Sequence, residues 1–220
     1  MKYERLRKQL ARFGKRIADE HLVVGPGGNI SARIRNRMLI KASGVPLEEA
    51  RPEDYIALDI ATGTALEKGG RPSSEVPMHL ACYRVRPDVG AVVHTHPPFA
   101  TGVACAGVTL RPMFPDFVAI IGSDVPTLPF VIPCGEELAM VVSQAVSKAN
   151  AALMGNHGAI TVGANLREAF YRAMLLEVAA QGLVAGTIVG KMRYLSREEV
   201  DTIRGLAKVE YRVSLLKQGK

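Results

Sequence analysis

Three of the five histidines stand where their imidazoles could bind a metal ion. His94 and His96 are separated by one residue in a run that predicts a buried strand, so both rings leave the same face. His157 lies at the tip of a predicted hairpin. Catalytic zinc takes three protein ligands and keeps an open position. The pattern is compatible with such a site, although a lone histidine in a hairpin is more often structural.

Glu75 adds a carboxyl group in the first turn of a predicted helix. A glutamate there can simply complement the helix dipole. Beside a metal ion, the same carboxylate would act as a general base or as a fourth ligand. His79 lies one helical turn after Glu75, and His21 has no metal-binding geometry. We interpret both of these histidines as structural.

Three short segments rich in glycine and hydroxyl side chains could bind a phosphate group. They are Gly27-Gly28-Asn29, Ser43-Gly44 and Ser73-Ser74. Backbone N–H groups converge in such turns and at helix N-termini, and short hydroxyls add further donors. Each segment alone is ordinary turn chemistry. The third would place an anion beside Glu75. Lys41 could assist, but a lysine at the edge of a strand is expected to be solvated.

The elements that must position these residues follow from hydrophobic periodicity and turn signals. The predicted strands are 30–34, 38–41, 55–60, 90–96, 125–131, 151–154 and 159–162. The predicted helices are 3–21, 74–86 with Ser74 as N-cap, 135–149, 165–189, and a last one that begins at Ser196. Asn165 with Glu168, and Ser196 with Glu199, form capping boxes.

Strands and helices alternate only partly along the chain. This order predicts an α/β fold, a single layered domain over residues 1–220 with a central, mostly antiparallel sheet flanked by helices.

Composition restricts the class of protein. Of the 220 residues, 48% are hydrophobic and 22% are charged, the ordinary balance of a globular chain. The longest apolar stretch, 173–190, contains Glu177 and Gln181, so no membrane span is predicted. The charged N-terminus argues against a secretory signal, and three widely spaced cysteines suit a reducing compartment. A cytoplasmic protein is expected.

The formal net charge of +7 fits an anionic partner. Basic residues are nevertheless scattered along the chain and lack the interleaved aromatics of a single-strand binder. The expected partner is therefore a small phosphorylated molecule and not a nucleic acid.

The residues singled out above occur together in an order that resembles the class II aldolase/adducin family. The matching pieces are Gly-Gly-Asn29-Ile-Ser31, Lys-Ala-Ser43-Gly44, Ser73-Ser74-Glu75, His94-Thr-His96-Pro and Asn156-His157-Gly158. Each piece is common, but the joint pattern, over residues 5–185, is specific. Within the family it is nearest to the aldolases of L-fuculose 1-phosphate.

The resemblance implies a homotetramer with active sites between subunits. It implies a zinc ion on His94, His96 and His157, with Glu75 as ligand and acid/base; Mn²⁺ or Co²⁺ could substitute for zinc. The residues that match the family's phosphate site are Gly28, Asn29, Ser43, Gly44, Ser73 and Ser74.

The implied reaction cleaves a small ketose 1-phosphate into dihydroxyacetone phosphate and an aldehyde. The substrate would be L-fuculose 1-phosphate or a related deoxy- or methylthio-pentulose 1-phosphate. Cleavage beside a ketone leaves an enediolate, whose charge zinc can neutralise. Glu75 would move the proton at the carbon next to the carbonyl.

One segment departs from the family pattern. Fuculose-phosphate aldolases protonate the departing alkoxide with a tyrosine from a neighbouring subunit, in the segment that matches 111–121. Here this segment reads RPMFPDFVAII, without a tyrosine. Asp116 and, in the C-terminal tail, Tyr211 are the candidate proton donors. The Pro115-Asp116 pair can equally be a turn or a helix cap.

Two other reactions use a similar zinc and carboxylate site. They are the dehydration of methylthioribulose 1-phosphate and the epimerisation of a pentulose 5-phosphate. Adducin-like domains keep the fold for protein binding without catalysis, but they lack the metal ligands that this chain has. A non-catalytic binding domain is therefore disfavoured.

Overall fold

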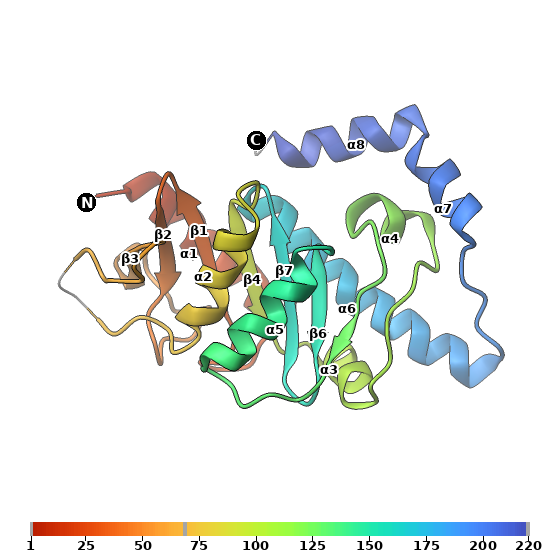
Figure 1. Ribbon diagram of the computed structural model, residues 1–220, viewed down its shortest axis with the longest axis horizontal. Helices are drawn as coiled ribbons and strands as arrows, with labels where there is room; N and C mark the ends of the chain where they lie inside the picture. The colour runs from red at the N-terminus through yellow and green to blue at the C-terminus, as the bar shows by residue number, and fades with distance from the viewer. Residues whose placement is uncertain (1, 68–69, 219–220) are drawn as a thin grey trace.

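A computed structural model describes residues 2–67 and 70–218, and its centre is one twisted sheet (Figure 1). In the described part, seven strands form the order β3-β2-β1-β4-β7-β6-β5. They are β1 (Asn29–Ile34), β2 (Arg37–Lys41), β3 (Tyr55–Asp59), β4 (Ala91–Thr95), β5 (Thr127–Leu128), β6 (Ala151–Met154) and β7 (Gly158–Gly163). Neighbouring strands are antiparallel except for β5 and β6. The predicted mostly antiparallel sheet is confirmed.

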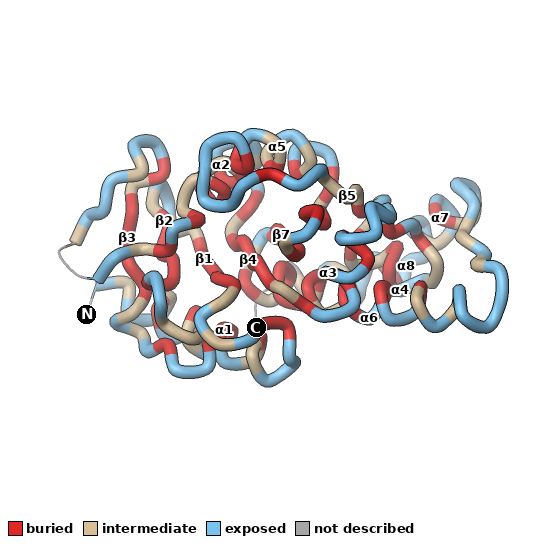
Figure 2. Tube along the Cα trace, turned by 90° about the horizontal axis from the view of Figure 1, so that it is seen from below, coloured by how far each residue is buried: buried red, intermediate tan, exposed pale blue. Residues whose placement is uncertain are grey.

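Helices cover both faces of this sheet. The described helices are α1 (Glu4–Asp19), the short 3-10 helix η1 (Pro52–Asp54), α2 (Val76–Val85), α3 (Pro98–Cys105), α4 (Pro115–Ile120), α5 (Glu136–Val146), α6 (Leu166–Val189), α7 (Arg197–Arg204) and α8 (Ala207–Lys217), of which α7 and α8 pack on other helices. Figure 2 shows α2 and α5 above the strands, with α1 and α6 below them.

The two faces of the strands form separate cores because successive side chains point to opposite sides. Ile40 and Ile160 pack with α2 and α5, whereas Leu39 and Val93 pack with α1 and the first half of α6. A third core joins α3, α4 and α6 against β6 and β7. The central strands are therefore held from both sides, which fixes the residues at their ends.

Most predicted elements are present, with ends displaced by one to a few residues. The predicted strand 125–131 is wrong in length, since only Thr127–Leu128 pairs in the sheet. Pro126 and Pro129 flank this pair and lack the N–H that a longer ladder needs. The helix that begins after Ser196 is interrupted at Gly205 and continues as α8.

The start of α2 also differs from the prediction. Glu75, not Ser74, occupies the N-cap position, and no side chain caps the helix. The Ser74 side chain is exposed, while the Ser73 hydroxyl accepts a hydrogen bond from the Glu75 backbone N–H at 3.2 Å. The turn thus directs the Glu75 side chain inward.

Among the described residues, α6 alone is long and apolar enough to cross a membrane. Its buried face packs on β4, β7 and α3. The Glu177 carboxylate, which interrupts its apolar run, accepts hydrogen bonds from the backbone N–H groups of Phe99 and Ala100 at 3.0 and 2.8 Å. These contacts are those of a core helix that also holds the start of α3.

Candidate metal centre

Four elements bring the predicted metal ligands to one end of the sheet. His94 lies in β4, and His96 follows directly after it. His157 occupies the tight turn between β6 and β7, where its backbone N–H donates to the Met154 carbonyl at 3.1 Å. Glu75 stands at the start of α2. We call these four residues the histidine centre.

One ring nitrogen from each of the three histidines lies within 4.8 Å of the other two. Nε2 of His94 is 2.9 Å from Nε2 of His96 and 3.1 Å from Glu75 Oε2. Glu75 Oε1 is 3.4 Å from His157 Nε2. Two imidazole nitrogens on one tetrahedral zinc ion stand about 3.4 Å apart. The four side chains therefore have the spacing of a divalent metal site.

The hydrogen bonds of His94 show why this cluster suits a cation. Its Nδ1–H donates to the Ala159 carbonyl at 2.9 Å, so Nε2 carries a lone pair. That lone pair faces the Glu75 carboxylate, which is also an acceptor. Glu75 Oε1 and His157 Nδ1 are buried without a hydrogen-bond partner. Acceptors gathered in this way need a positive charge among them, and the residues fit a metal ion.

Burial keeps two of these rings neutral, as metal ligation requires. Burial, with the neighbouring rings of His94 and His157, lowers the pKa of His96 to about 4. The pKa of His157 is lowered by burial and by His94. Neither imidazole needs to lose a proton at neutral pH before it binds a metal.

Glu75 behaves in the opposite way. Burial alone would raise the pKa of Glu75, but the charge and hydrogen bond of His94 and the charge of His157, whenever these rings are protonated, together with the Asn29 amide outweigh burial and hold this pKa well below its ordinary value. The Asn29 Nδ2–H donates to Oε2 at 2.7 Å. Glu75 is therefore a carboxylate at neutral pH.

Glycines make this close approach possible. A Cβ on Gly158 would lie 2.4 Å from the Thr95 carbonyl and 2.6 Å from His96 Cδ2. Gly28 has φ +65, and a Cβ there would lie 2.8 Å from the His94 carbonyl. Side chains at either position would push the histidine-bearing segments apart.

Two of the three predicted phosphate segments, Ser43-Gly44 and Ser73-Ser74, are tied to each other beside this centre. The backbone N–H of Ser43 donates to the Arg71 carbonyl at 2.8 Å, and that of Ser73 donates to the Lys41 carbonyl at 3.0 Å. Ser43, Gly44 and Ser74 are exposed, whereas Ser73 and Asn29 are buried.

Lys41 contradicts the expectation of a solvated side chain. Its side chain is 2% exposed, and its Nζ donates to the carbonyls of Pro26 and Val45. These bonds join the loop before Gly27 to the loop after Gly44. Burial lowers the pKa of Lys41, opposed by the charges of Glu48 and Glu75. The prediction failed because the end of β2 is covered by two loops, one directly after the strand and one before β1.

The two candidate proton donors are not brought to the histidines within one chain. Asp116 is exposed in the first turn of α4, 3.4 Å from Arg212 of α8. Tyr211 is an exposed residue of α8. The Leu216 carbonyl of α8 accepts a hydrogen bond from the Asn165 side chain, just beyond the Gly163 end of β7. His157 lies before the opposite end of this strand (Figure 1).

Sequence reasoning missed a row of buried polar side chains behind Glu75. His79, interpreted as structural, binds the Asn29 side chain through its Nε2. Ser31 and Tyr83 extend the row on the far side of His79. A signal was present: Glu75, His79 and Tyr83 recur every four residues on one helix face, and Asn29 and Ser31 share one strand face.

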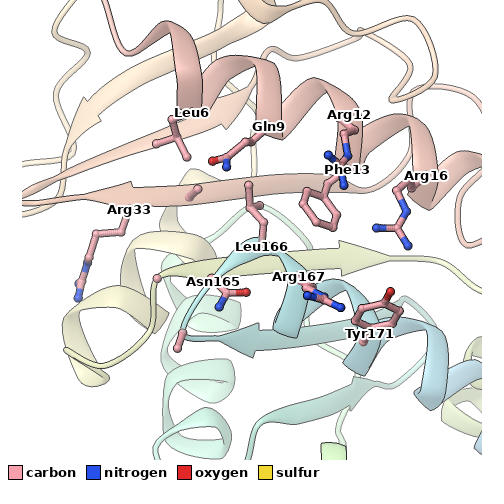
Figure 3. Close-up of a pocket in the computed structure, with 13 residues that line it drawn as sticks. Leu6, Gln9, Arg12, Phe13, Arg16, Arg33, Asn165, Leu166, Arg167 and Tyr171 are labelled. Carbon is pink, nitrogen blue, oxygen red and sulfur yellow. The ribbon is translucent and has the colours of Figure 1, made fainter. Parts of the chain in front are cut away.

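A groove of about 320 Å³ lies apart from the histidine centre, between α1 and the start of α6 (Figure 3). Arg12, Arg16 and Arg167 line it together with Tyr171. A hydrogen bond from Arg16, with further help from Arg167, lowers the pKa of Tyr171. None of the predicted metal or phosphate residues lines this groove.

Comparison with known proteins gives a consistent result. Residues 8–184 match the family model described as class II aldolase and adducin N-terminal domain. The chain is 33% identical over 205 residues to 5-deoxy-D-ribulose 1-phosphate aldolase of Bacillus thuringiensis, covering 92% of this chain and 95% of that protein. It is 32% identical over 187 residues to L-fuculose phosphate aldolase of Haemophilus influenzae, covering 82% and 83%.

A solved structure is similar over the same extent. L-Fuculose 1-phosphate aldolase superposes with a TM-score of 0.86 at 30% identity, covering 93% of this chain and 96% of that chain. The similarity spans the elements that carry the histidine centre.

Proposed function

The chain belongs to the class II aldolase and adducin family, and on that premise we propose that it is a metal-dependent aldolase of a small ketose 1-phosphate. The products would be dihydroxyacetone phosphate and an aldehyde. The substrate class follows the names of its relatives, which act on 5-deoxyribulose 1-phosphate and fuculose phosphate. The observation that carries the proposal is a buried carboxylate against three converging imidazoles.

His94, His96 and His157 would hold the metal ion, with zinc as the ion of choice and Mn²⁺ or Co²⁺ as substitutes. When bound, the ion would polarise the ketose carbonyl and stabilise the negative charge that cleavage leaves beside it. The Ala159 carbonyl fixes the ring of His94, so its Nε2 points into the site.

Glu75 would be a further metal ligand and the group that moves the proton at the carbon next to the carbonyl. Its Oε2 accepts from the Asn29 amide, whereas Oε1 is buried without a hydrogen-bond donor. Oε1 is thus the oxygen left free to take a proton. Its low pKa means that the carboxylate is in the basic form before substrate binds.

Convergent loops would bind the phosphate. Gly28 and Asn29 lie on one side of Lys41, and Ser43 with Gly44 on the other, while Ser73 and Ser74 lead directly into Glu75. Backbone N–H groups and the two exposed serine hydroxyls would contact the phosphate oxygens. The buried cation of Lys41 adds a favourable charge beneath them.

We place the protein in the cytoplasm as a homotetramer with its active sites between subunits. Apolar side chains are exposed after β5: Phe130, whose backbone lies against Gly155 in the turn that carries His157, is 53% exposed, and Ile132, two residues farther along the chain, is 70% exposed. Exposed apolar groups beside a site mark an interaction surface. A neighbouring subunit would also supply the proton donor, Asp116 or Tyr211. Light scattering after size exclusion would measure the assembly.

The decisive experiment is hydrogen exchange on dihydroxyacetone phosphate. Zinc-loaded protein in heavy water should exchange a hydrogen of the hydroxymethyl carbon, which is the reverse half of the cleavage. Glu75→Gln should keep the metal and lose exchange by about 10²–10⁴-fold. The absence of exchange in the wild type at full zinc occupancy would contradict an aldolase, and retained exchange in the variant would remove Glu75 from the mechanism.

Release of dihydroxyacetone phosphate from two substrates would identify the sugar. We expect release from 5-deoxyribulose 1-phosphate or from L-fuculose 1-phosphate. Loss of water from methylthioribulose 1-phosphate without a three-carbon product would favour the dehydratase, and interconversion of pentulose 5-phosphates the epimerase. The names of the relatives favour the aldolase over both.

A further inference from the structure

Five buried polar side chains form one continuous row that ends on Glu75. From the far end they are Tyr83, Ser31, His79, Asn29 and Glu75. Tyr83 is 1% exposed, and Ser31 and His79 are 0% exposed. A row of this kind inside a core is costly unless every group in it is paired.

The carboxylate sets the direction of every hydrogen bond in the row. Glu75 can only accept, so the Asn29 amide must present its NH₂ to Oε2, across 2.7 Å. The Asn29 Oδ1 is then turned to His79, and His79 Nε2 must donate to it. This fixes one tautomer, in which His79 Nδ1 is an acceptor.

The same constraint passes to the last two members. His79 Nδ1 is 2.7 Å from the Ser31 hydroxyl, which must donate to it. The Ser31 oxygen is 2.8 Å from the Tyr83 hydroxyl, so Tyr83 donates to Ser31. The bonds all run one way, from Tyr83 toward the carboxylate, and no member has an alternative arrangement that keeps its neighbours paired.

His79 can play this part only as a neutral ring. It is buried, and burial lowers its pKa to about 3. A neutral ring with one donor and one acceptor nitrogen connects an amide oxygen on one side to a hydroxyl on the other. His79 can therefore fix the orientation of the Asn29 amide, and through it that of Glu75. The sequence had predicted only a structural role for this histidine.

We propose that Asn29, His79, Ser31 and Tyr83 are positioning residues that hold Glu75 in its working orientation. The family pattern would assign the Asn29 side chain to the phosphate. Here this side chain binds Glu75 and His79, so only the Asn29 backbone is left to bind the phosphate. The inference rests on the proposed aldolase function, because it concerns the base of that reaction. A carboxylate misplaced by about 1 Å loses roughly 10²-fold in rate.

The test compares kcat and KM of variants along the row, each loaded with zinc. His79→Leu keeps the volume and removes both hydrogen bonds, and we expect kcat to fall about 10–100-fold with KM changed less than about threefold. His79→Gln restores an amide donor and should recover part of kcat. Ser31→Ala and Tyr83→Phe lie farther from Glu75 and should lose progressively less.

Thr161→Val is the matched control. Thr161 is a buried residue of β7 whose hydroxyl donates to the Ala169 carbonyl at 2.8 Å, whereas the hydrogen bonds of the row are made by other residues. It should lower the melting temperature about as much as Ser31→Ala and leave kcat unchanged. A structural role alone would make the two variants alike in kcat, and that result would overturn the proposal.

Failure of this inference can be told apart from failure of the proposed function. If wild-type protein exchanges dihydroxyacetone phosphate and Glu75→Gln does not, the aldolase stands. In that case, a zinc-loaded His79→Leu variant with wild-type kcat would sink the positioning row alone. A fall in kcat that merely tracks lost zinc or lost folded protein would do the same.

Discussion

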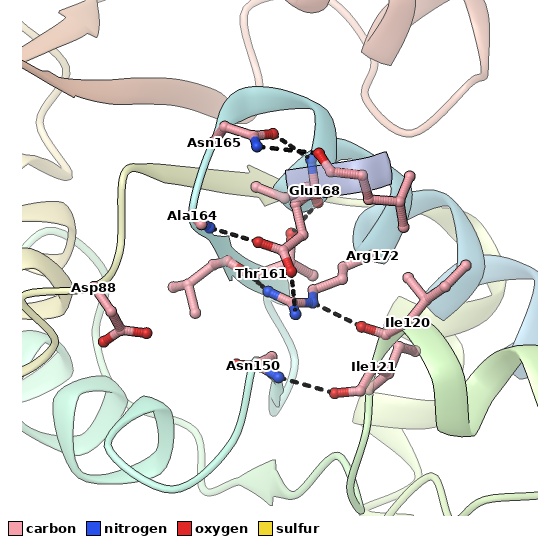
Figure 4. Close-up of polar contacts among 12 residues, drawn as sticks. Asp88, Ile120, Ile121, Asn150, Thr161, Ala164, Asn165, Glu168 and Arg172 are labelled. Atoms are coloured by element: carbon pink, nitrogen blue, oxygen red, sulfur yellow. Dashed lines mark hydrogen bonds and ion pairs between the residues drawn. The ribbon is translucent and has the colours of Figure 1, made fainter. Parts of the chain in front are cut away.

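Two buried polar clusters lie at opposite ends of the central strands, and they are built on opposite principles. The histidine centre meets the His94 end of β4 and the turn before β7. The other cluster, which we call the Glu168–Arg172 cluster, lies where β7 leads into α6 (Figure 4). Both combine charged side chains that are almost fully covered.

The Glu168–Arg172 cluster pairs its groups completely. The Arg172 guanidinium donates to Glu168 Oε1 at 2.8 Å, to the Ile120 carbonyl at 2.8 Å and to the Val162 carbonyl at 2.6 Å. Glu168 Oε2 accepts from the Ala164 backbone N–H at 2.6 Å. Figure 4 shows these contacts converging from three segments. Within the part of the chain that the structure describes, no buried side-chain nitrogen or oxygen of Glu168 or Arg172 lacks a partner, so this cluster serves the fold.

The histidine centre leaves its acceptors facing one another. Glu75 Oε1 and His157 Nδ1 are buried and unpaired, and no atom in the Glu168–Arg172 cluster is in that condition among the described residues. Leaving buried polar groups unpaired costs stability. Both clusters are charged and buried. The comparison therefore shows that the feature that distinguishes a binding site is a buried polar atom without a hydrogen-bond partner, which a ligand can supply.

The largest effect should come from removing a metal ligand. His94→Ala should lose bound zinc and lower aldolase activity by about 10³-fold or more, since the ion supplies several kcal/mol of charge stabilisation. Metal content and activity are measured on the same folded preparation. Full activity with zinc bound would show that the histidines are a structural cluster like the one at the other end.

Breaking the paired cluster should cost stability and leave chemistry alone. Arg172→Met strands the Glu168 carboxylate in the core and should lower the free energy of unfolding by about 3–5 kcal/mol. Denaturant titration measures this, with kcat per folded molecule unchanged. A Glu168→Gln/Arg172→Met double variant should recover part of the loss. A destabilisation below about 1 kcal/mol would contradict the structural role.

Metal removal should change the melting temperature only in proteins whose histidine centre is intact. With free zinc at 100 times its dissociation constant, binding adds about 2.7 kcal/mol. For a chain of this length, chelation should therefore lower the melting temperature by about 5–10 °C. The same shift is expected in Arg172→Met and none in His94→Ala. A shift that survives in His94→Ala would place the metal elsewhere.

Lowering the pH should have the smallest of these effects on stability. Burial lowers the pKa of His79 to about 3 and that of His96 to about 4, against about 6.5 in an unfolded chain. Below about pH 6.5, His79 and His96 bind protons in the unfolded state but stay neutral in the folded state. The free energy of unfolding therefore decreases as the pH is lowered, by up to about 1.4 kcal/mol per pH unit for each ring. The decrease stops once the pH is below the pKa of the folded state.

Urea titrations of metal-free protein between pH 7 and 5 measure this slope. His79→Leu should show a slope shallower by one histidine's share, and Arg172→Met should keep the wild-type slope. Equal slopes in wild type and His79→Leu would mean that His79 is protonated in the folded protein.

The sequence predicted the clustering of His94, His96 and His157 well because their arrangement is partly local. The period of two in a strand sends His94 and His96 to one face whatever surrounds them. The N-caps at Asn165 and Ser196 were equally local, and both side chains accept the N–H bonds expected of them. Only Ser196 forms the predicted capping box, because the Glu168 carboxylate accepts from the Ala164 backbone N–H. These features depend on residues a few positions apart.

The errors came where distant segments meet. Lys41 reads as a strand-edge residue, but besides the nearby Val45 carbonyl its Nζ reaches the Pro26 carbonyl, in the loop before β1. His79 reads as an isolated histidine on a helix, and only the pairing of β1 beside β4 brings Asn29 between it and Glu75. No short-range pattern contains such a contact.

By itself, then, the amino-acid sequence determined the kinds of element, the directions of their side chains and the set of groups that we propose to bind a metal and a phosphate. The tertiary structure alone decided which of these groups touch: which carboxyl oxygen stays unpaired, which histidine holds Asn29, and which charges are fully paired. The reason is physical. Side-chain direction follows local backbone geometry, whereas contacts follow sheet order and register, which are set by packing over the whole chain.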